Sequence, residues 1–304
     1  MLKGTQINLD QLLRLRYYAQ GIDLSRCKRV TAKHSGLDIS GFRGRGMDFD
    51  EVRVYQSGDE IRNMDWRVTA RTGVAHTKLY KEERERPVYV VVDYSASMQF
   101  GTQVAFKSVI AAEAATLVAW AAANHGDRVG ALVFNGKTQI ESKPAPRERG
   151  VMPILKILAN LQEQQEAQPG GLAKALATLR HSIRPGSIIF IFSDFNSLDE
   201  EAKHYLAQMA PRNEIVAHYI YDALEANLPP PARYGFSDGS VITNINTHVD
   251  VLRERFAAQY QTRVDLIRKT LHQRRIPMLE LATHHAVAQV LQRRLSHNQR
   301  MQWK

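Results

Sequence analysis

Strand-like and helix-like patterns alternate along the chain from residue 87 onward. Nearly continuous apolar runs predict strands covered on both faces over 88–93, 127–134, 187–194, 214–221 and 276–283. Apolar residues recur at the helical period between these runs, and the predicted helices cover 104–123, 151–165, 172–183, 198–210, 249–273 and 284–296. Because strands that alternate with helices form parallel sheets with right-handed crossovers, we expect an α/β fold with a mostly parallel, doubly wound sheet.

The chain before residue 87 has a different pattern. Leucines at helical spacing predict a helix over 8–20, and glycines interleaved with arginines then predict a flexible basic loop. Residues 47–86 are dense in charge, with strand-like runs such as EVRVY and HTKLY. The predicted division is therefore residues 1–86 (helix, basic Gly/Arg loop and β-rich segment) and residues 87–304, an α/β domain with terminal helices and an excursion near 222–247.

Composition narrows the class of protein. Of the 304 residues, 44% are hydrophobic and 24% charged, which excludes a disordered or fibrous chain. A single cysteine, Cys27, excludes a disulfide scaffold and a multi-cysteine zinc site. The first residues contain no apolar core of signal-peptide length, and no run of about 18 apolar residues predicts a membrane span. We therefore expect a cytoplasmic protein.

The net charge of +10 is concentrated at the two ends of the chain. Residues 1–45 carry +6 and residues 246–304 carry +7, whereas residues 46–245 carry −3. Basic ends of this kind are typical of proteins that bind RNA or another polyanion, and also of solvated helix faces. Both interpretations stay open.

Two of the predicted strands end in an acid. The first closes with Asp93, which Ser95 and Ser97 follow, and a later strand closes with Asp194. Ligands of open α/β sheets bind outside the carboxyl ends of the strands, and oxygen donors of this kind suit Mg²⁺ or Mn²⁺. Asp194 would then supply its carboxylate through a water molecule. The serines are also suited to cap the following helix, so the spacing alone leaves two interpretations.

The pattern DxSxS after a buried strand, with a later strand ending in Asp, resembles the metal-ion-dependent adhesion site of von Willebrand factor type A domains. Two stretches are more specific: GRGMDFDEVRVYQSGDEIRNMDWRVTARTG (44–73) and KLYKEERERPVYVVVDYSASM (78–98). They resemble the signature of the prokaryotic "domain of unknown function 58" family, which combines the type A fold with a preceding β-rich segment. The resemblance covers roughly residues 40–225.

The resemblance implies a protein-binding module and no enzyme. In such domains a partner's acidic side chain fills an open coordination position of the metal. Family members accompany AAA+ ATPases of the MoxR type as adaptors or chaperone-like factors. Many carry N-terminal membrane spans, and this chain resembles the short cytoplasmic form without them.

The implied metal ligands are Asp93, Ser95, Ser97 and Asp194. The family pattern also expects a threonine in a Gly-Gly-Thr run, but this chain has Leu172 after Gly170 and Gly171, and Thr178 lies two turns further along the predicted helix. With one oxygen ligand missing, we expect weak binding of Mg²⁺ or Mn²⁺.

The charged block before the α/β domain is a second candidate site. Its proposed partner-binding residues are Arg53, Asp59, Arg62, Asp65 and Arg71. Opposite charges at this density are also typical of structural ion pairs, each contributing little when exposed. In that interpretation Trp66 is a core residue.

A phosphohydrolase is the weaker alternative. Asp93 at a strand end is placed like a phosphatase nucleophile, but that chemistry needs a second acid two residues later as general acid and base. Ser95 occupies that position.

Overall fold

The computed structural model describes residues 2–24, 47–57, 59, 61–82, 86–163, 167–237 and 242–296. The chain divides into two compact units, of which one comprises Met1–Thr31 and Arg86–Lys304 and the other Ala32–Glu85. The predicted division is therefore wrong for the N-terminal helix, which belongs to the α/β unit. Most of the basic Gly/Arg loop, together with Cys27, lies outside the described residues.

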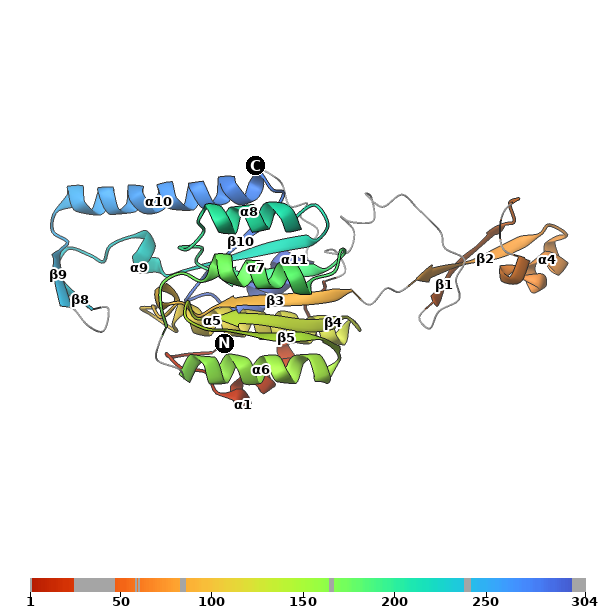
Figure 1. Ribbon diagram of the computed structural model, residues 1–304, viewed down its shortest axis with the longest axis horizontal. Helices are drawn as coiled ribbons and strands as arrows, with labels where there is room; N and C mark the ends of the chain where they lie inside the picture. Colours follow the sequence, from red (N-terminus) through yellow and green to blue (C-terminus); the bar gives the residue numbers. More distant parts are fainter. Residues whose placement is uncertain are drawn as a thin grey trace. The chain divides into compact units, whose positions relative to one another are not determined.

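A six-stranded sheet forms the centre of the larger unit (Figure 1). Its strands are β3 (Pro87–Asp93), β4 (Arg128–Phe134), β5 (Gln139–Pro146), β6 (Ile188–Ser193), β7 (Glu214–Tyr221) and β10 (Met278–Ala282). They lie in the order β10–β7–β6–β3–β4–β5, and every neighbouring pair is parallel except β4–β5. The mostly parallel α/β sheet is confirmed.

Strand β5 was absent from the sequence prediction for a physical reason. It lies antiparallel at the edge of the sheet, and its residues QIESKPAP are exposed or half-buried. An edge strand needs no continuous apolar run, and edge positions tolerate its two prolines.

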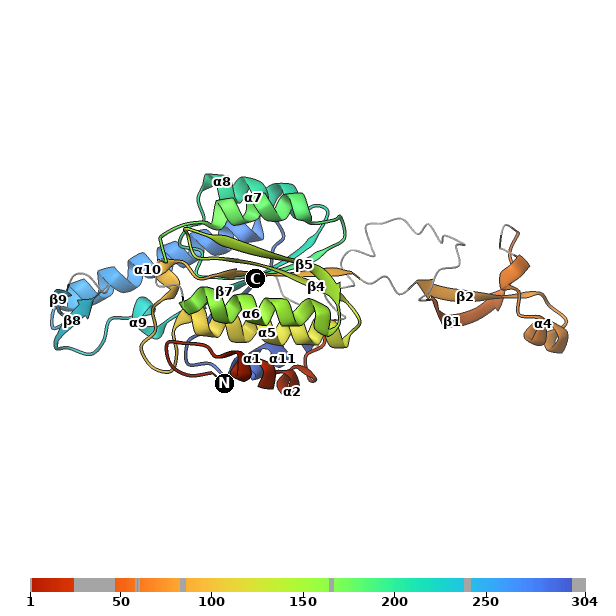
Figure 2. The same ribbon diagram turned by 60° about the horizontal axis from the view of Figure 1, so that its bottom comes forward.

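Helices cover both faces of the sheet (Figure 2). They are α1 (Leu9–Arg14), α2 (Arg16–Ala19), α5 (Lys107–Asn124), α6 (Glu148–Glu163), α7 (Leu172–Ser182), α8 (Glu200–Met209), α10 (Asp250–His272) and α11 (Val287–Ser296). Helices α1, α2, α5, α6 and α11 contribute to the hydrophobic cluster on one face, and α7, α8 and α10 to the cluster on the other. The sheet is thus doubly wound.

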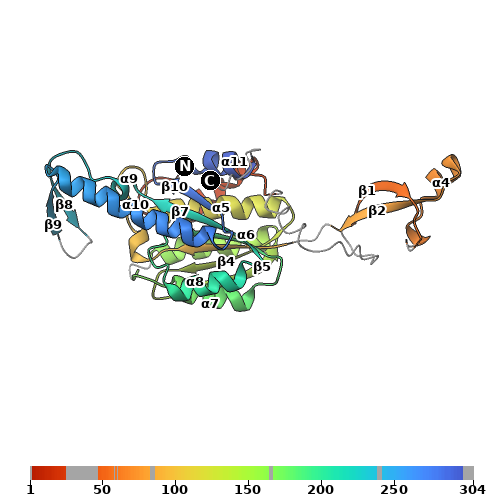
Figure 3. The same ribbon diagram turned by 90° about the horizontal axis from the view of Figure 1, so that it is seen from above.

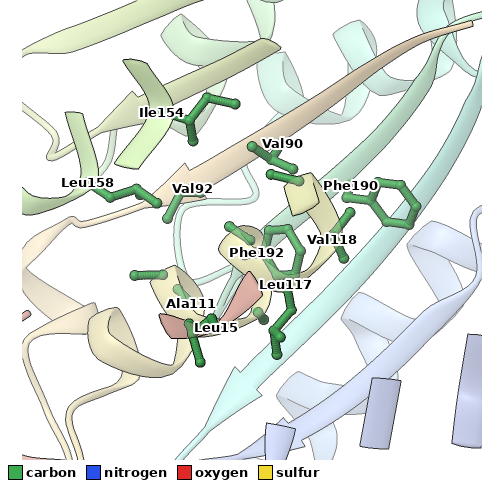
Figure 4. Packing of buried hydrophobic residues seen from close by; sticks show 14 of the residues in the cluster. Leu15, Val90, Val92, Ala111, Leu117, Val118, Ile154, Leu158, Phe190 and Phe192 are labelled. Atoms are coloured by element: carbon green, nitrogen blue, oxygen red, sulfur yellow. The ribbon is translucent and has the colours of Figure 1, made fainter. Parts of the chain in front are cut away.

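Helix α5 is buried along almost its whole length. Its inner side meets alternate residues of the strands, among them Val92 and Phe192, and Phe192 lies beside Leu117 and Val118 (Figure 4). Its outer side is covered by α2 and α11. Every residue from Lys107 to Ala123 is buried, so any charge in this helix must find a partner inside the protein.

The expected excursion after β7 contains a short helix and a hairpin. Helix α9 (Ala223–Ala226) is followed by β8 (Arg233–Ser237) and β9 (Ile242–Asn246), which pair antiparallel beside the start of α10 (Figure 3). In the part of the chain that the structure describes, no helix is long and apolar enough to cross a membrane.

The smaller unit is built on an antiparallel pair, β1 (Met47–Val54) and β2 (His76–Glu82). A 3-10 turn, η1 (Ile61–Asn63), and helix α4 (Trp66–Thr72) connect the two strands. Asp65 caps α4 by accepting hydrogen bonds from the backbone N–H groups of Arg67 and Val68. The expectation that Trp66 is a core residue is wrong, since it is 65% exposed at the first position of this helix.

Candidate functional site

The candidate site lies where the winding direction of the sheet reverses. From β3 the chain crosses by way of α5 to β4 on one side, and later returns to β6 on the other side of β3. The carboxyl ends of β3 and β6 are therefore neighbours at a topological switch point, where ligands of open α/β sheets bind. Asp93 ends β3, and Asp194 directly follows β6.

Asp93 is a buried carboxyl group with its own hydrogen-bond donors. Its Oδ1 accepts from the backbone N–H of Ser95 at 2.8 Å, and its Oδ2 accepts from the Ser193 hydroxyl at 2.6 Å. Burial, and then the negative charge of Asp194, raise the pKa of Asp93 to about 7, although the hydrogen bonds from Ser193 and Ser95 oppose this shift. The carboxylate form therefore lacks a compensating positive charge.

Two hydroxyls lie beside this carboxyl group. Ser95 is buried and Ser97 half-buried, and their Oγ atoms are 3.4 Å apart. The interpretation that these serines cap the following helix is wrong. No side-chain cap is formed by Ser95 before the 3-10 turn η2 (Ala96–Met98), and α5 begins only at Lys107.

Asp194 is held by a buried ammonium group. The Nζ of Lys107, which is fully buried, lies 2.8 Å from Asp194 Oδ2 and 2.7 Å from Glu225 Oε1. Asn196 donates to both carboxylate oxygens of Asp194, through its side chain (2.8 Å) and its backbone N–H (3.0 Å). Burial lowers the pKa of Lys107, but Asp194 and Glu225 together raise it further, so the net shift is upward. Lys107 is thus a built-in cation of this site.

The position at which the family pattern expects a threonine offers no side-chain oxygen. Gly171, with φ of +99°, precedes Leu172, whose side chain is buried in the core. Thr178 does not replace the threonine, because its hydroxyl accepts a hydrogen bond from the side chain of Gln139 on the edge strand β5. The loop contributes a backbone contact instead, since the Gln168 carbonyl accepts from the N–H of Ala96 at 3.2 Å.

We expect Gly136→Ala to destabilise the protein by at least about 2 kcal/mol. Gly136 has φ of +85°, and a Cβ there would lie 2.1 Å from the Gln168 carbonyl oxygen. Gly126→Ala is the matched control, since its φ of +83° is the same but a Cβ there meets no atom within 4 Å. The control carries the conformational cost of about 1–2 kcal/mol alone. Thermal melting of the two variants checks the difference, and equal losses would contradict it.

Only the oxygen donors that follow β3, and not Asp194 after β6, are suited to bind a hard cation directly. Asp93, Ser95 and Ser97 place oxygen donors together, the type of ligand that Mg²⁺ and Mn²⁺ prefer. Asp194 is already satisfied by Lys107 and Asn196. No group of three or more His, Cys, Asp or Glu side chains that could hold a metal occurs within the described ranges. A cation at this edge would therefore depend on the two serine hydroxyls.

The five predicted partner-binding residues lie in the smaller unit and have different environments. Arg53 and Asp59 form an ion pair at 2.7 Å, and Asp65 is the cap of α4. Arg62 and Arg71 are exposed. The block is therefore partly structural, as the alternative interpretation expects, and partly free surface.

Comparisons with known proteins decide the family. The family described as "Protein of unknown function DUF58" matches residues 51–265, which is more than half of the chain. The chain belongs to the DUF58 family. Uncharacterised proteins of Mycobacterium bovis and Mycobacterium tuberculosis are 32% identical over 244 residues, which cover 79% of this chain and 76% of theirs. The predicted family is confirmed.

Two solved structures resemble this DUF58 protein more distantly. The crystal structure of the conserved hypothetical protein BatB from Bacteroides thetaiotaomicron has a TM-score of 0.41 at 12% identity, covering 69% of this chain and 97% of that one. An aerotolerance-related membrane protein from Bacteroides fragilis has a TM-score of 0.39 at 11% identity, with coverages of 69% and 98%.

Sequence reasoning missed three of the side chains that shape the site of this DUF58 protein. Lys107, Glu225 and Asn196 all contact Asp194 or its ion pair. One signal was available, because Lys107, like Glu113, interrupts a largely apolar, alanine-rich helix. A charge in a helix that is buried all round must be paired, so such a lysine indicates a buried acid elsewhere in the chain.

Proposed function

We propose that this DUF58 protein is a protein-binding module whose binding edge is the carboxyl end of its central sheet. In this proposal the edge is that of a von Willebrand factor type A-like domain, and a Mg²⁺ or Mn²⁺ ion modulates the binding. Asp93, Ser95 and Ser97 bind the ion directly. Asp194, which forms an ion pair with Lys107, lies beside it. The ion offers an open coordination position to an acidic side chain of the partner.

Charge balance at the edge is the observation that carries this proposal. Asp93, Asp194 and Glu225 are three buried or half-buried carboxyl groups, and Lys107 is the single cation that contacts them in the described part of the chain. When all are ionised, two negative charges remain uncompensated. A divalent cation supplies the missing charge, and buried carboxylates require compensation of this kind.

The edge is accessible at the place where a partner would reach it. Ala96 and Asn196 are exposed, although Asp93 and Asp194 beneath them are only 1% and 4% exposed. A partner side chain therefore approaches past the turn at Ala96, between the loops that follow β3 and β6.

The partner class rests on the resemblance to the family signature. We propose an AAA+ ATPase of the MoxR type, to which this protein binds as an adaptor or chaperone-like factor in the cytoplasm. RNA or polyanion binding through the basic ends is the alternative, but residues 25–46 and 297–304, which carry part of that charge, lie outside the described residues. Phosphohydrolysis is the less supported reading, because the general acid that it needs is replaced by Ser95.

Divalent cation binding is the direct test. We expect MnCl₂ at about ten times the dissociation constant to stabilise the wild-type protein by about 1.4 kcal/mol relative to EDTA. For a protein of this size that raises the melting temperature by about 3–6 °C. The double variant Ser95→Ala/Ser97→Ala should lose this response, because two of three direct oxygen ligands are removed. Thermal melting and isothermal titration calorimetry measure the response.

A matched control distinguishes the loss of metal ligands from a general effect of removing two hydroxyl groups. Ser142→Ala/Ser182→Ala removes two half-buried hydroxyls, from β5 and α7 of the same unit, and should leave the response to Mn²⁺ unchanged. No melting shift and no heat with the wild-type protein at 10 mM MnCl₂ would refute the cation. Binding of a purified MoxR-type ATPase that is equal in Mg²⁺ and in EDTA would refute its role in partner binding.

A further inference from the structure

The smaller unit exposes an aromatic side chain among unpaired arginines. Trp66 is 65% exposed and Ile61 is 64% exposed. Arg62, Arg67 and Arg71, which lie in the same short stretch of chain, are also exposed. We call the surface formed by these five residues the α4 face. Large exposed aromatic residues beside arginines are typical of the energetic centres of protein interfaces.

The two described acidic residues of this stretch already have partners. Asp59 pairs with Arg53 at 2.7 Å, and the Asp65 carboxylate caps α4 and lies 3.5 Å from Lys78 Nζ. Across the described part of the chain, none of the three arginines of the α4 face belongs to an ion pair. The three arginines of the α4 face therefore have no ion-pair partner in the described part of the smaller unit.

The five residues come from turn η1 and helix α4, which both pack on strand β2. Helix α4 turns Val68 and Thr69 toward the unit, where the Thr69 hydroxyl accepts a hydrogen bond from the N–H of His76 in β2. At 100° per residue, Trp66, Arg67 and Arg71 then share the opposite arc of the helix. Turn η1, which carries Ile61 and Arg62, ends two residues before the cap residue Asp65 and also packs on β2.

We propose that the α4 face is a docking site for an acidic polypeptide segment that carries a large apolar side chain. The apolar side chain packs on Trp66 and Ile61, and its flanking carboxylates pair with the three arginines, two of which are spaced one helical turn apart. Helix α4 is only about 10 Å long, so the segment is short. This proposal does not depend on a cation at the edge of the sheet.

Charge favours a polypeptide over a nucleic acid on this surface. By sequence, residues 32–85 contain ten acidic and ten basic residues, so the smaller unit has no net positive charge. A groove that follows a phosphate backbone needs a continuous basic surface. Three arginines around one tryptophan match a short acidic segment with an apolar anchor instead.

Fluorescence polarisation with the full-length protein tests the proposal. The probe is a fluorescein-labelled 12-residue peptide of Glu and Asp that contains two leucines one helical turn apart. Its two controls are the same peptide with Gln and Asn in place of the acids, and a labelled 12-nucleotide poly-U RNA. We expect saturable binding of the acidic peptide, at least tenfold tighter than that of either control.

Substitutions locate the binding site. We expect Trp66→Ala to weaken binding of the acidic peptide at least tenfold, and Arg67→Gln/Arg71→Gln to weaken it about tenfold and reduce its salt dependence. Arg293→Gln/Arg294→Gln, an exposed pair on α11, is the charge-matched control and should leave the affinity unchanged. The melting temperature of Trp66→Ala should equal that of the wild type, because the side chain is exposed.

Three results would overturn the docking site. They are the absence of saturable binding up to 1 mM peptide, tighter binding of the RNA than of the peptide, and unchanged affinity in Trp66→Ala. The second result would transfer the α4 face to nucleic-acid binding. The melting response to Mn²⁺ is measured separately in the same preparations, so failure of the docking site and failure of the cation site are distinguishable.

Discussion

Replacing Lys107 with methionine is expected to destabilise the protein by about 3–5 kcal/mol in the presence of EDTA. Lys107 Nζ lies within 2.8 Å of both Asp194 and Glu225 and is fully buried. Methionine matches the length of the aliphatic part of the side chain, so the loss comes from the two carboxylates that stay behind without their cation. Chemical denaturation in EDTA measures the difference.

Divalent cations should partly reverse this loss. Without the ammonium group, the edge carries three uncompensated carboxylates, those of Asp93, Asp194 and Glu225. We therefore expect Mn²⁺ to raise the melting temperature of Lys107→Met more than that of the wild type. The double variant Lys107→Met/Asp194→Asn removes one charge of each sign, and it should recover part of the stability that Lys107→Met loses.

The control is a surface ion pair of the same length. Lys203 Nζ lies 2.7 Å from Glu200, whose side chain is 90% exposed. Exposed pairs contribute at most about 1 kcal/mol, so Lys203→Met should lose no more than that. If Lys107→Met melts like the wild type in EDTA and ignores Mn²⁺, Lys107 is not the resident cation of the site.

The second large effect is expected on acidification, from a histidine in the core. His218 in β7 is fully buried and stacks on Phe192 at a ring distance of 4.5 Å, with Phe190 at 5.9 Å. Neither ring nitrogen has a hydrogen-bond partner among the described residues. Burial lowers the pKa of His218 to about 3 from its ordinary value of 6.5.

The sign of the pH effect follows from this depressed pKa. Between pH 6.5 and pH 3 the unfolded chain binds a proton at this histidine and the folded chain does not, so stability falls as the pH falls. The contribution is complete above pH 6.5, and about 2 kcal/mol of it is lost by pH 5. That loss corresponds to a decrease in melting temperature of about 4–8 °C.

Comparison with His218→Leu isolates this contribution. Asp93 and Glu214, whose pKa values are raised to about 7 mainly by burial, act in the opposite direction and are common to both proteins. The melting temperature of His218→Leu should therefore fall less between pH 7.5 and pH 5 than that of the wild type. His204→Leu, at an exposed position, should behave like the wild type. Parallel pH profiles for the wild type and His218→Leu would contradict the assignment.

Local patterns were sufficient for most of the α/β unit. The five parallel strands and the main helices lie within a few residues of their predicted positions, as β7 (Glu214–Tyr221) illustrates. Helical and strand periods are properties of neighbouring residues, so they can be read without knowing the fold. The N-terminal helices were assigned to the wrong unit, because periodicity does not show which part of the protein a helix packs against. In the structure α2 packs on α5.

Only one property of the candidate site could be predicted from the sequence, namely that the acids at the ends of two parallel strands lie close together. Parallel strands end at the same edge of a sheet, so Asp93 and Asp194 had to be close once both strands were recognised. The spacing could not distinguish capping serines from ligand serines. Excluding the capping role needed the start of α5 at Lys107, ten residues beyond Ser97.

By itself, the amino-acid sequence determined the family, the alternation of strands and helices, and the acids at the switch point, since each depends on neighbouring residues or on the ends of parallel strands. Only the tertiary structure decided that Asp194 is bound by Lys107, which lies 87 positions away along the chain. It also decided that Trp66 is exposed, because the buried side of a short helix depends on the strand beneath it. Burial and charge pairing are long-range properties, and the chain acquires them only when its segments meet.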